Sequence, residues 1–371
     1  MPNFVQQNCD GKVSIGGMRS MLLAAGSRYS LHAQESEVSL VDEGIQLRHQ
    51  LRSAGYSGLA IDAAWPEWWG TEASTSLSAV TELKLTVARR LGITPSSLFG
   101  DQGPTFSWAD SARFKNLGTT SLREQGILSS FGVSLAGLLT RGAPEATVDV
   151  PENIGAAWFR ERLEELGGYT LRHLVALCWA VGIPVVQTHV FPLPQKRMHA
   201  VTASVRGRSA IILGESTFYP AKAAFTIAHE LGHVFLGHTT GAPTFIDVAD
   251  PVSEDLDAEE SAANTFALRL LTGRAEFEIR AGEAAYTAPQ LADAAMSASA
   301  ASGIDAGLIV LMLARQVDDW PRAIAALNLL GREPVAQRIN QLARTMLRMD
   351  AFNADEIAYL ENVLTGRSTS A

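Results

Sequence analysis

The chain has 371 residues, of which 47% are hydrophobic and 19% charged, and its formal net charge is −9. This composition is typical of a well-cored globular protein of two or three domains and excludes a disordered or fibrous chain, and the negative charge argues against a protein built mainly to hold nucleic-acid backbones. We find no signal peptide, no apolar run of the roughly 18–20 residues that a membrane span needs, and only two cysteines, so we expect a soluble, cytoplasmic protein without a disulfide framework or a membrane partner.

Residues 1–145 are predicted to form an N-terminal helical domain. Residues 1–150 carry 12 Lys and Arg against 14 Asp and Glu, so this part is close to neutral and strong DNA binding is not indicated. The aromatic cluster at residues 65–70 (WPEWWG) is too dense for a surface loop. We interpret it as a packing plug between helices, with a ligand-stacking platform as the alternative.

Residues 60–100 contain a segment that resembles the closing half of a repressor-type helix-turn-helix domain. Ser78 is a candidate N-cap for a helix that runs to Leu91 and ends at Gly92, and a second short helix follows. No clean polar recognition helix precedes it, because residues 65–72 stand where that helix would lie. A degenerate helical domain for protein contacts is therefore favoured, and weak DNA contact stays open as the alternative.

The middle of the chain alternates between helical and strand patterns. We predict helices at 108–115 and 122–139, a linker at 142–147, helices at 156–166 and 170–180, a strand at 184–190, and a β-hairpin at 199–214 that turns at 206–208. A mostly helical α+β fold with a small mixed sheet of about three strands follows from this order.

Residues 225–238 read FTIAHELGHVFLGH and contain the pattern H-E-x-x-H. At about 100° per residue, His229 and His233 lie about 40° apart on one helix face, where two imidazoles can bind one Zn²⁺ and Glu230 can take a proton from water. The alternative is a chance motif with solvated histidines. The apolar flanks argue against it, because burying three unpartnered polar groups would cost a few kcal/mol each.

A catalytic zinc site needs a third protein ligand. His238 would lie roughly 140° round the helix from His233 if the helix continued, which disfavours it. In residues 257–271, Glu260 extends the apolar stripe of a predicted helix by one turn, whereas Glu259 points about 100° away. We therefore predict Glu260 as the third ligand, and Asn264, one turn later, as a contact to the ligand shell.

These two motifs, with EESAANTFALRLL as the second, resemble the ImmA/IrrE family of bacterial zinc metallopeptidases. The resemblance implies a zincin-like peptidase domain at residues 150–275, with His229, His233 and Glu260 as zinc ligands and Glu230 as general base. The family usually has proline after its L-L, where this chain has Thr272. Members often carry a repressor-like domain before the peptidase, which supports the assignment at residues 60–100.

Residues 276–371 are predicted to form a C-terminal helical domain. Apolar stripes at 304–315, 322–330, 335–349 and 354–364 are read as core packing, with a partner-binding groove as the minority interpretation.

We therefore expect a zinc metalloendopeptidase of narrow specificity. By resemblance, its substrate would be a repressor or antitoxin in stress, phage-defence or mobile-element control. A DNA-binding regulator with a sensory peptidase-like domain and the toxin of a toxin–antitoxin pair are the alternatives. The intact Glu230 favours an enzyme. The oxyanion donor stays open among Tyr219, His238 and His199.

Overall fold

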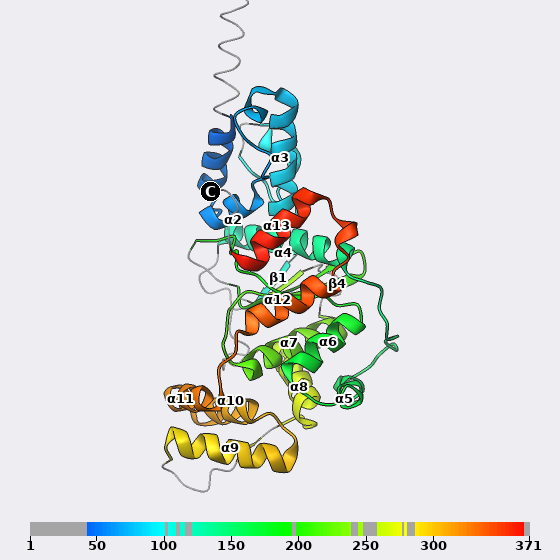
Figure 1. Ribbon diagram of the computed structural model, residues 1–371, viewed down its shortest axis with the longest axis vertical. Helices are drawn as coiled ribbons and strands as arrows, with labels where there is room; N and C mark the ends of the chain where they lie inside the picture. Colours follow the sequence, from blue (N-terminus) through cyan, green and yellow to red (C-terminus); the bar gives the residue numbers. More distant parts are fainter. Residues whose placement is uncertain are drawn as a thin grey trace, which may run out of the picture.

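The computed structural model describes residues 43–100, 103–108, 112–115, 121–194, 198–238, 244–247, 258–276, 278–279 and 286–366. Figure 1 shows an elongated arrangement in which the N-terminal helices lie at one end and the helices α9–α11 at the other. The sheet and the helix α7 lie between them. α7 (Pro220–Phe235) carries the H-E-x-x-H motif, so the motif sits in the middle of the molecule.

The N-terminal end is helical, as predicted. It comprises a helical stretch at 43–53, α2 (Gly58–Ala64), η1 (Ala73–Thr75), α3 (Leu77–Leu91) and η2 (Pro95–Leu98). The cap of α3 is Ser76 and not Ser78, because Ser76 has the extended backbone of an N-cap and its hydroxyl accepts a hydrogen bond from Ala79 N. Gly92 ends α3 as expected, with φ of 71°. A Cβ there would lie 2.2 Å from the backbone oxygen of Ser130.

The tryptophan cluster behaves as a packing element. Trp65 and Trp69 pack against the core with their rings edge to face, and the Arg48 guanidinium lies 4.0 Å from the Trp65 ring centroid. Trp68 is 40% exposed. Residues 65–72, all of them described, form turns and bends rather than a helix, so the position of a recognition helix holds none. The helix-turn-helix assignment stays a prediction.

The sheet has five described strands in the order β1-β5-β3-β4-β2. They are β1 (Ala112–Lys115), β2 (Val185–Gln187), β3 (Ala200–Val205), β4 (Arg208–Leu213) and β5 (Thr244–Asp247). β3 pairs antiparallel with β4 and β5, whereas β2 with β4 and β1 with β5 are parallel. The predicted strand and hairpin are confirmed as β2, β3 and β4.

The predicted helix at 108–115 is wrong, since residues 112–115 form the strand β1. β1 and β5 each have four residues, too few for a strand periodicity to stand out in the sequence. Their pairing partners are remote in the chain, so the tertiary fold and not the local sequence makes them strands.

Helices cover both faces of the sheet. α4 (Leu122–Gly142) packs on β3 and β4 from one face, and α7 packs on the same two strands from the other. β1 belongs to this sheet and α4 packs on it, although both precede the boundary predicted at residues 145–150. The predicted linker is packed, because Ala143 is buried and Thr147 N donates to Ala180 O. The division into three domains stays a prediction.

The helices next to α7 follow the prediction. α5 (Ala156–Glu165) and α6 (Leu171–Ala180) precede the sheet, and α8 (Ala258–Thr272) follows β5 and packs along α7. The C-terminal helices are α9 (Ala288–Ser302), α10 (Ala306–Val317), α11 (Trp320–Leu330), α12 (Val335–Met346), η3 (Met349–Ala351) and α13 (Ala354–Thr365). α9, α10 and α11 pack on one another, and α10 also contacts α7.

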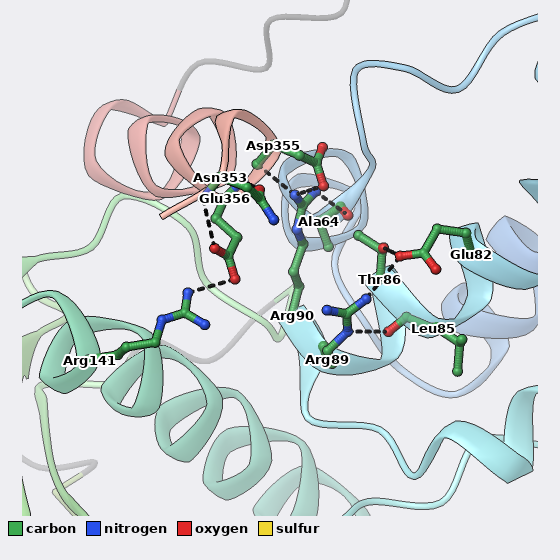
Figure 2. Close-up of polar contacts among 10 residues, drawn as sticks. All are labelled: Ala64, Glu82, Leu85, Thr86, Arg89, Arg90, Arg141, Asn353, Asp355 and Glu356. Carbon is green, nitrogen blue, oxygen red and sulfur yellow. Dashed lines mark hydrogen bonds and ion pairs between the residues drawn. The ribbon is translucent and has the colours of Figure 1, made fainter. Parts of the chain in front are cut away.

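The last two helices close the fold back on earlier elements. From α12, the buried Asn340 side chain accepts a hydrogen bond from Gln187 N and donates to Gln187 O, both at 2.8 Å, and so occupies the β2 edge like another strand. α13 reaches the N-terminal helices, where Arg90 donates to Ala64 O at 3.1 Å and to the Asp355 carboxylate (Figure 2). Arg90 is only 7% exposed, so the N-terminal helices are fixed to the C-terminal end of the chain by a buried cation.

Among the described helices, no single one is long and apolar enough to cross a membrane. α9 and α10 reach that length and hydropathy only together, and they are bent by 119° where they meet.

Candidate metal centre

The site is built where α7 and α8 pack against each other. Pro220 occupies the first turn of α7, where its missing N–H costs nothing, and the central part of the helix is buried. Gly232 lets α8 approach closely, because a Cβ there would lie 3.1 Å from Ala263 Cα and 3.2 Å from Phe266 Cβ. This approach brings the first turn of α8, with Glu260, next to the histidine face of α7.

His229, His233 and Glu260 converge in the interior. Both histidines are fully buried and Glu260 is 3% exposed. The two Nε2 atoms lie 2.9 Å apart, Glu260 Oε2 lies 3.1 Å from His229 Nε2, and Glu260 Oε1 lies 3.5 Å from His233 Nε2. Ligands held tetrahedrally at about 2.0–2.1 Å from a metal lie roughly 3.3 Å apart, so these separations suit one small cation.

The outer ring nitrogens of both histidines have partners that aim Nε2 at the centre. His229 Nδ1 lies 2.9 Å from Asn264 Oδ1, and His233 Nδ1 lies 2.8 Å from His238 Nδ1. Because an amide oxygen only accepts, His229 carries its proton on Nδ1 and turns the lone pair of Nε2 inward. Two imidazole nitrogens and a carboxylate then face one another, an arrangement that a divalent cation stabilises, and this donor set suits zinc.

His238 does not join the ligand atoms. α7 ends at Phe235, Gly237 has φ of 77°, and His238 N donates to His233 O at 3.0 Å. The chain therefore turns back and places the His238 ring beside Nδ1 of His233. The expectation that His238 points away assumed a continuing helix, whereas the turn makes it a partner of a ligand candidate. Within the described residues, the cluster with metal-ligand spacing is His229, His233 and Glu260.

Glu230 is fully buried beside this cluster and receives a hydrogen bond from the sheet. Thr202 Oγ1, on β3, donates to Glu230 Oε2 at 2.5 Å. Thr202 was missed by sequence reasoning, although a lone threonine in the otherwise apolar start of β3 is a weak signal of a polar partner. The bond fixes one carboxylate oxygen of Glu230, so the orientation of this side chain depends on both α7, which carries it, and β3, which holds its end.

Thr226 lies one turn before Glu230 on the same face of α7, and it contacts a pair of polar residues from the β3–β4 hairpin ends, His199 and Glu215. His199 Nδ1 lies 2.7 Å from Glu215 Oε2, and His199 Nε2 lies 3.4 Å from Thr226 Oγ1. The bond from His199, together with the charge of Lys222, lowers the pKa of Glu215 to about 2. Tyr219, another of the residues considered as an oxyanion donor, donates its hydroxyl hydrogen bond to Asn328 Oδ1 on α11.

The candidate metal centre lies in a segment that matches a known protein family. Residues 184–295 match the model of the IrrE N-terminal-like domain, a peptidase family. This part of the chain is therefore similar to the ImmA/IrrE peptidases. The matched residues include β2 to β5, α7 and α8, and with them all three ligand candidates. No curated protein and no solved structure matches the chain. The helix-turn-helix-like region lies outside the matched segment.

The ImmA/IrrE-type domain also borders a cavity away from the metal centre. The cavity has a volume of about 920 Å³ and lies between α6, the first turn of α7 and helices α9 to α12. Its lining includes Pro220, Ala221 and Ala224 from α7 but none of the candidate metal ligands. The half of α7 that carries the candidate metal ligands is therefore separate from this cavity.

Proposed function

We propose that this chain is a zinc-dependent endopeptidase of narrow specificity whose substrate is a regulatory protein such as a repressor or an antitoxin. The observation that carries the proposal is the buried cluster of His229, His233 and Glu260 with Glu230 beside it. These three residues would hold the zinc, and a set of three protein donors is typical of a hydrolytic rather than a structural zinc site. The family match supports a metallopeptidase in the same residues.

In this mechanism, zinc supplies Lewis-acid activation of the scissile carbonyl and of a water molecule. Glu230 accepts the proton of the attacking water and later delivers it to the leaving amine. Thr202 holds the Glu230 carboxylate in place through its hydroxyl. Asn264 and His238 fix the ring orientations of His229 and His233, so the chain presents a preorganised set of donors.

The burial of these groups supports narrow specificity. A peptide must reach side chains that are almost fully enclosed, so only a segment that fits the surrounding helices and β3 can present its carbonyl. Because the enclosed site limits which peptide segments can enter, we expect the enzyme to cleave one particular protein and not to degrade proteins in general.

The test combines metal analysis with cleavage of a partner. We expect one zinc per chain in the wild type and in Glu230→Gln, and cleavage of a co-expressed neighbouring gene product by the wild type alone. Intact-mass spectrometry of the partner locates the cut. Cleavage that persists in Glu230→Gln would contradict the mechanism, and a wild-type chain that binds no zinc would contradict the proposed function.

A further inference from the structure

The pair of His199 and Glu215 is a polar contact that the metal centre does not use, with a buried imidazole and a carboxylate whose side chain is 41% exposed. His199 is 7% exposed and precedes β3, whereas Glu215 follows β4. The two segments are joined by backbone bonds, since Gly214 N and Glu215 N both donate to His199 O. The hairpin therefore holds the imidazole and the carboxylate together regardless of the conformation of surface loops.

Both ring nitrogens of His199 lie next to an oxygen atom. Thr226 Oγ1 donates to Lys222 O at 3.1 Å, so its single hydroxyl hydrogen is engaged and its oxygen accepts from His199 Nε2. The Glu215 carboxylate accepts from Nδ1 at 2.7 Å. Each ring nitrogen of His199 therefore faces an oxygen that can accept a hydrogen bond.

The imidazole is directed at the catalytic face of α7. Thr226 precedes His229 by three residues and Glu230 by four, so it lies on their side of the helix, roughly 4.5–6 Å away along the axis. Thr202, on β3, donates to Glu230, and His199, just before β3, contacts Thr226. His199 and Thr202 thus face the same stretch of α7, at positions one helical turn apart.

We propose that His199 is the oxyanion-stabilising catalytic residue of this peptidase, with Glu215 as its positioning residue. This inference rests on the proposed function. As water adds to the scissile carbonyl, a C–O bond forms, the π electrons move onto the carbonyl oxygen, and Glu230 takes the water proton. His199 Nε2–H donates to the resulting oxyanion without transferring its proton. The C–N bond then breaks, and the Glu230 proton goes to the amine.

The contact from His199 Nε2 to Thr226 Oγ1 is long, so replacing Thr226 by an oxyanion as the hydrogen-bond acceptor costs little. A 3.4 Å contact is at the outer limit of hydrogen bonding, so turning the Nε2–H from Thr226 to an oxyanion gives up little. Tyr219 and His238, the other two candidates for this role, have their polar atoms engaged by Asn328 and His233. A preorganised donor of this kind contributes about 10²–10³-fold to kcat.

The experiment compares two small probes on the full-length, zinc-loaded protein. N-phosphoryl-leucinamide mimics the tetrahedral oxyanion, whereas acetohydroxamate binds zinc without that geometry. We expect His199→Ala to weaken binding of the phosphoramidate about 10²–10³-fold while its zinc content and its hydroxamate Kd stay as in the wild type. His199→Gln, which keeps an N–H donor, is expected to recover part of the affinity. Glu215→Gln is expected to give a smaller loss.

His173→Ala serves as the matched control, because His173 lies on α6 and its Nδ1 contacts Thr170. It should bind both probes like the wild type. Equal phosphoramidate affinity in the wild type and His199→Ala, each with one zinc, would overturn the inference but leave the proposed function intact. If His199→Ala does not fold, His199→Leu replaces it, because leucine keeps much of the side-chain bulk without an N–H. A loss of the expected size with unchanged zinc content and hydroxamate Kd supports the inference, whereas wild-type phosphoramidate affinity refutes it. A wild type that binds neither zinc nor hydroxamate overturns both.

Discussion

Gly232→Ala tests whether the close approach of α8 to α7 creates the metal centre. In a helix interior, alanine is favoured over glycine by roughly 0.5–1 kcal/mol. Here the new Cβ would meet Ala263 Cα at 3.1 Å, Ala263 O at 3.2 Å and Phe266 Cβ at 3.2 Å. Two of these atoms belong to the α8 backbone and cannot rotate away, so α8 must move by a few tenths of an ångström.

The cost of packing the extra methyl group decides whether Gly232→Ala stabilises or destabilises the chain. Extra methyl groups in a packed interior cost about 1–3 kcal/mol, which exceeds the gain in helix propensity. We therefore expect Gly232→Ala to lower the free energy of unfolding of the zinc-free chain by about 1–2 kcal/mol, measured by urea denaturation. Because the shift of α8 carries Glu260 away from His229, zinc affinity in a chelator competition should fall at least about tenfold.

Gly137→Ala on α4 is the matched control. The nearest neighbour of its new Cβ would be a side-chain carbon of Val205 at 3.8 Å, an ordinary contact, so the propensity gain should appear unopposed. Unchanged zinc affinity and increased stability in Gly232→Ala, as in the control, would refute the role of the close approach.

Three further predictions concern charged groups. Glu260→Gln should weaken zinc binding at least about 10²-fold in a chelator competition whereas Glu259→Gln should not, and equal losses would remove Glu260 from the ligand set. Glu215 has a pKa lowered to about 2, so it contributes stability above its unfolded pKa of 4.5 that is lost as pH falls through 2; acid titration of Glu215→Gln should show a shallower loss between these values. Arg90→Ala should destabilise the chain by about 3–5 kcal/mol in urea because the buried contact to Asp355 is lost, and an effect under about 1 kcal/mol would contradict that assignment.

Local sequence was sufficient for elements whose residues interact along one helix or hairpin. The histidines at positions 229 and 233 share a face through helical periodicity alone, and Gly92 ends α3 because its left-handed backbone suits glycine. The β3–β4 hairpin was likewise evident from two alternating runs around a glycine turn. Each of these features depends on residues only a few positions apart.

Predictions failed where the chain is shaped by distant partners. β1 was predicted as a helix because its strand character comes from pairing with β5, more than 100 residues later. His238 was expected to point away, yet the end of α7 at Phe235 turns it toward His233. Local propensity gives no account of either, since pairing and chain reversal depend on what lies opposite in space.

The sequence by itself determined that the chain holds a pair of histidines and a carboxylate base on one helix, and it singled out Glu260 through an apolar stripe. Only the tertiary structure decided that Glu260 reaches the histidines, because that depends on the packing of α8 at Gly232. The same holds for Thr202 on Glu230 and for His199 on Thr226, contacts between residues 28 and 27 positions apart. Helical spacing is written in the sequence, whereas the convergence of a strand and two helices on one point is set by how their surfaces pack.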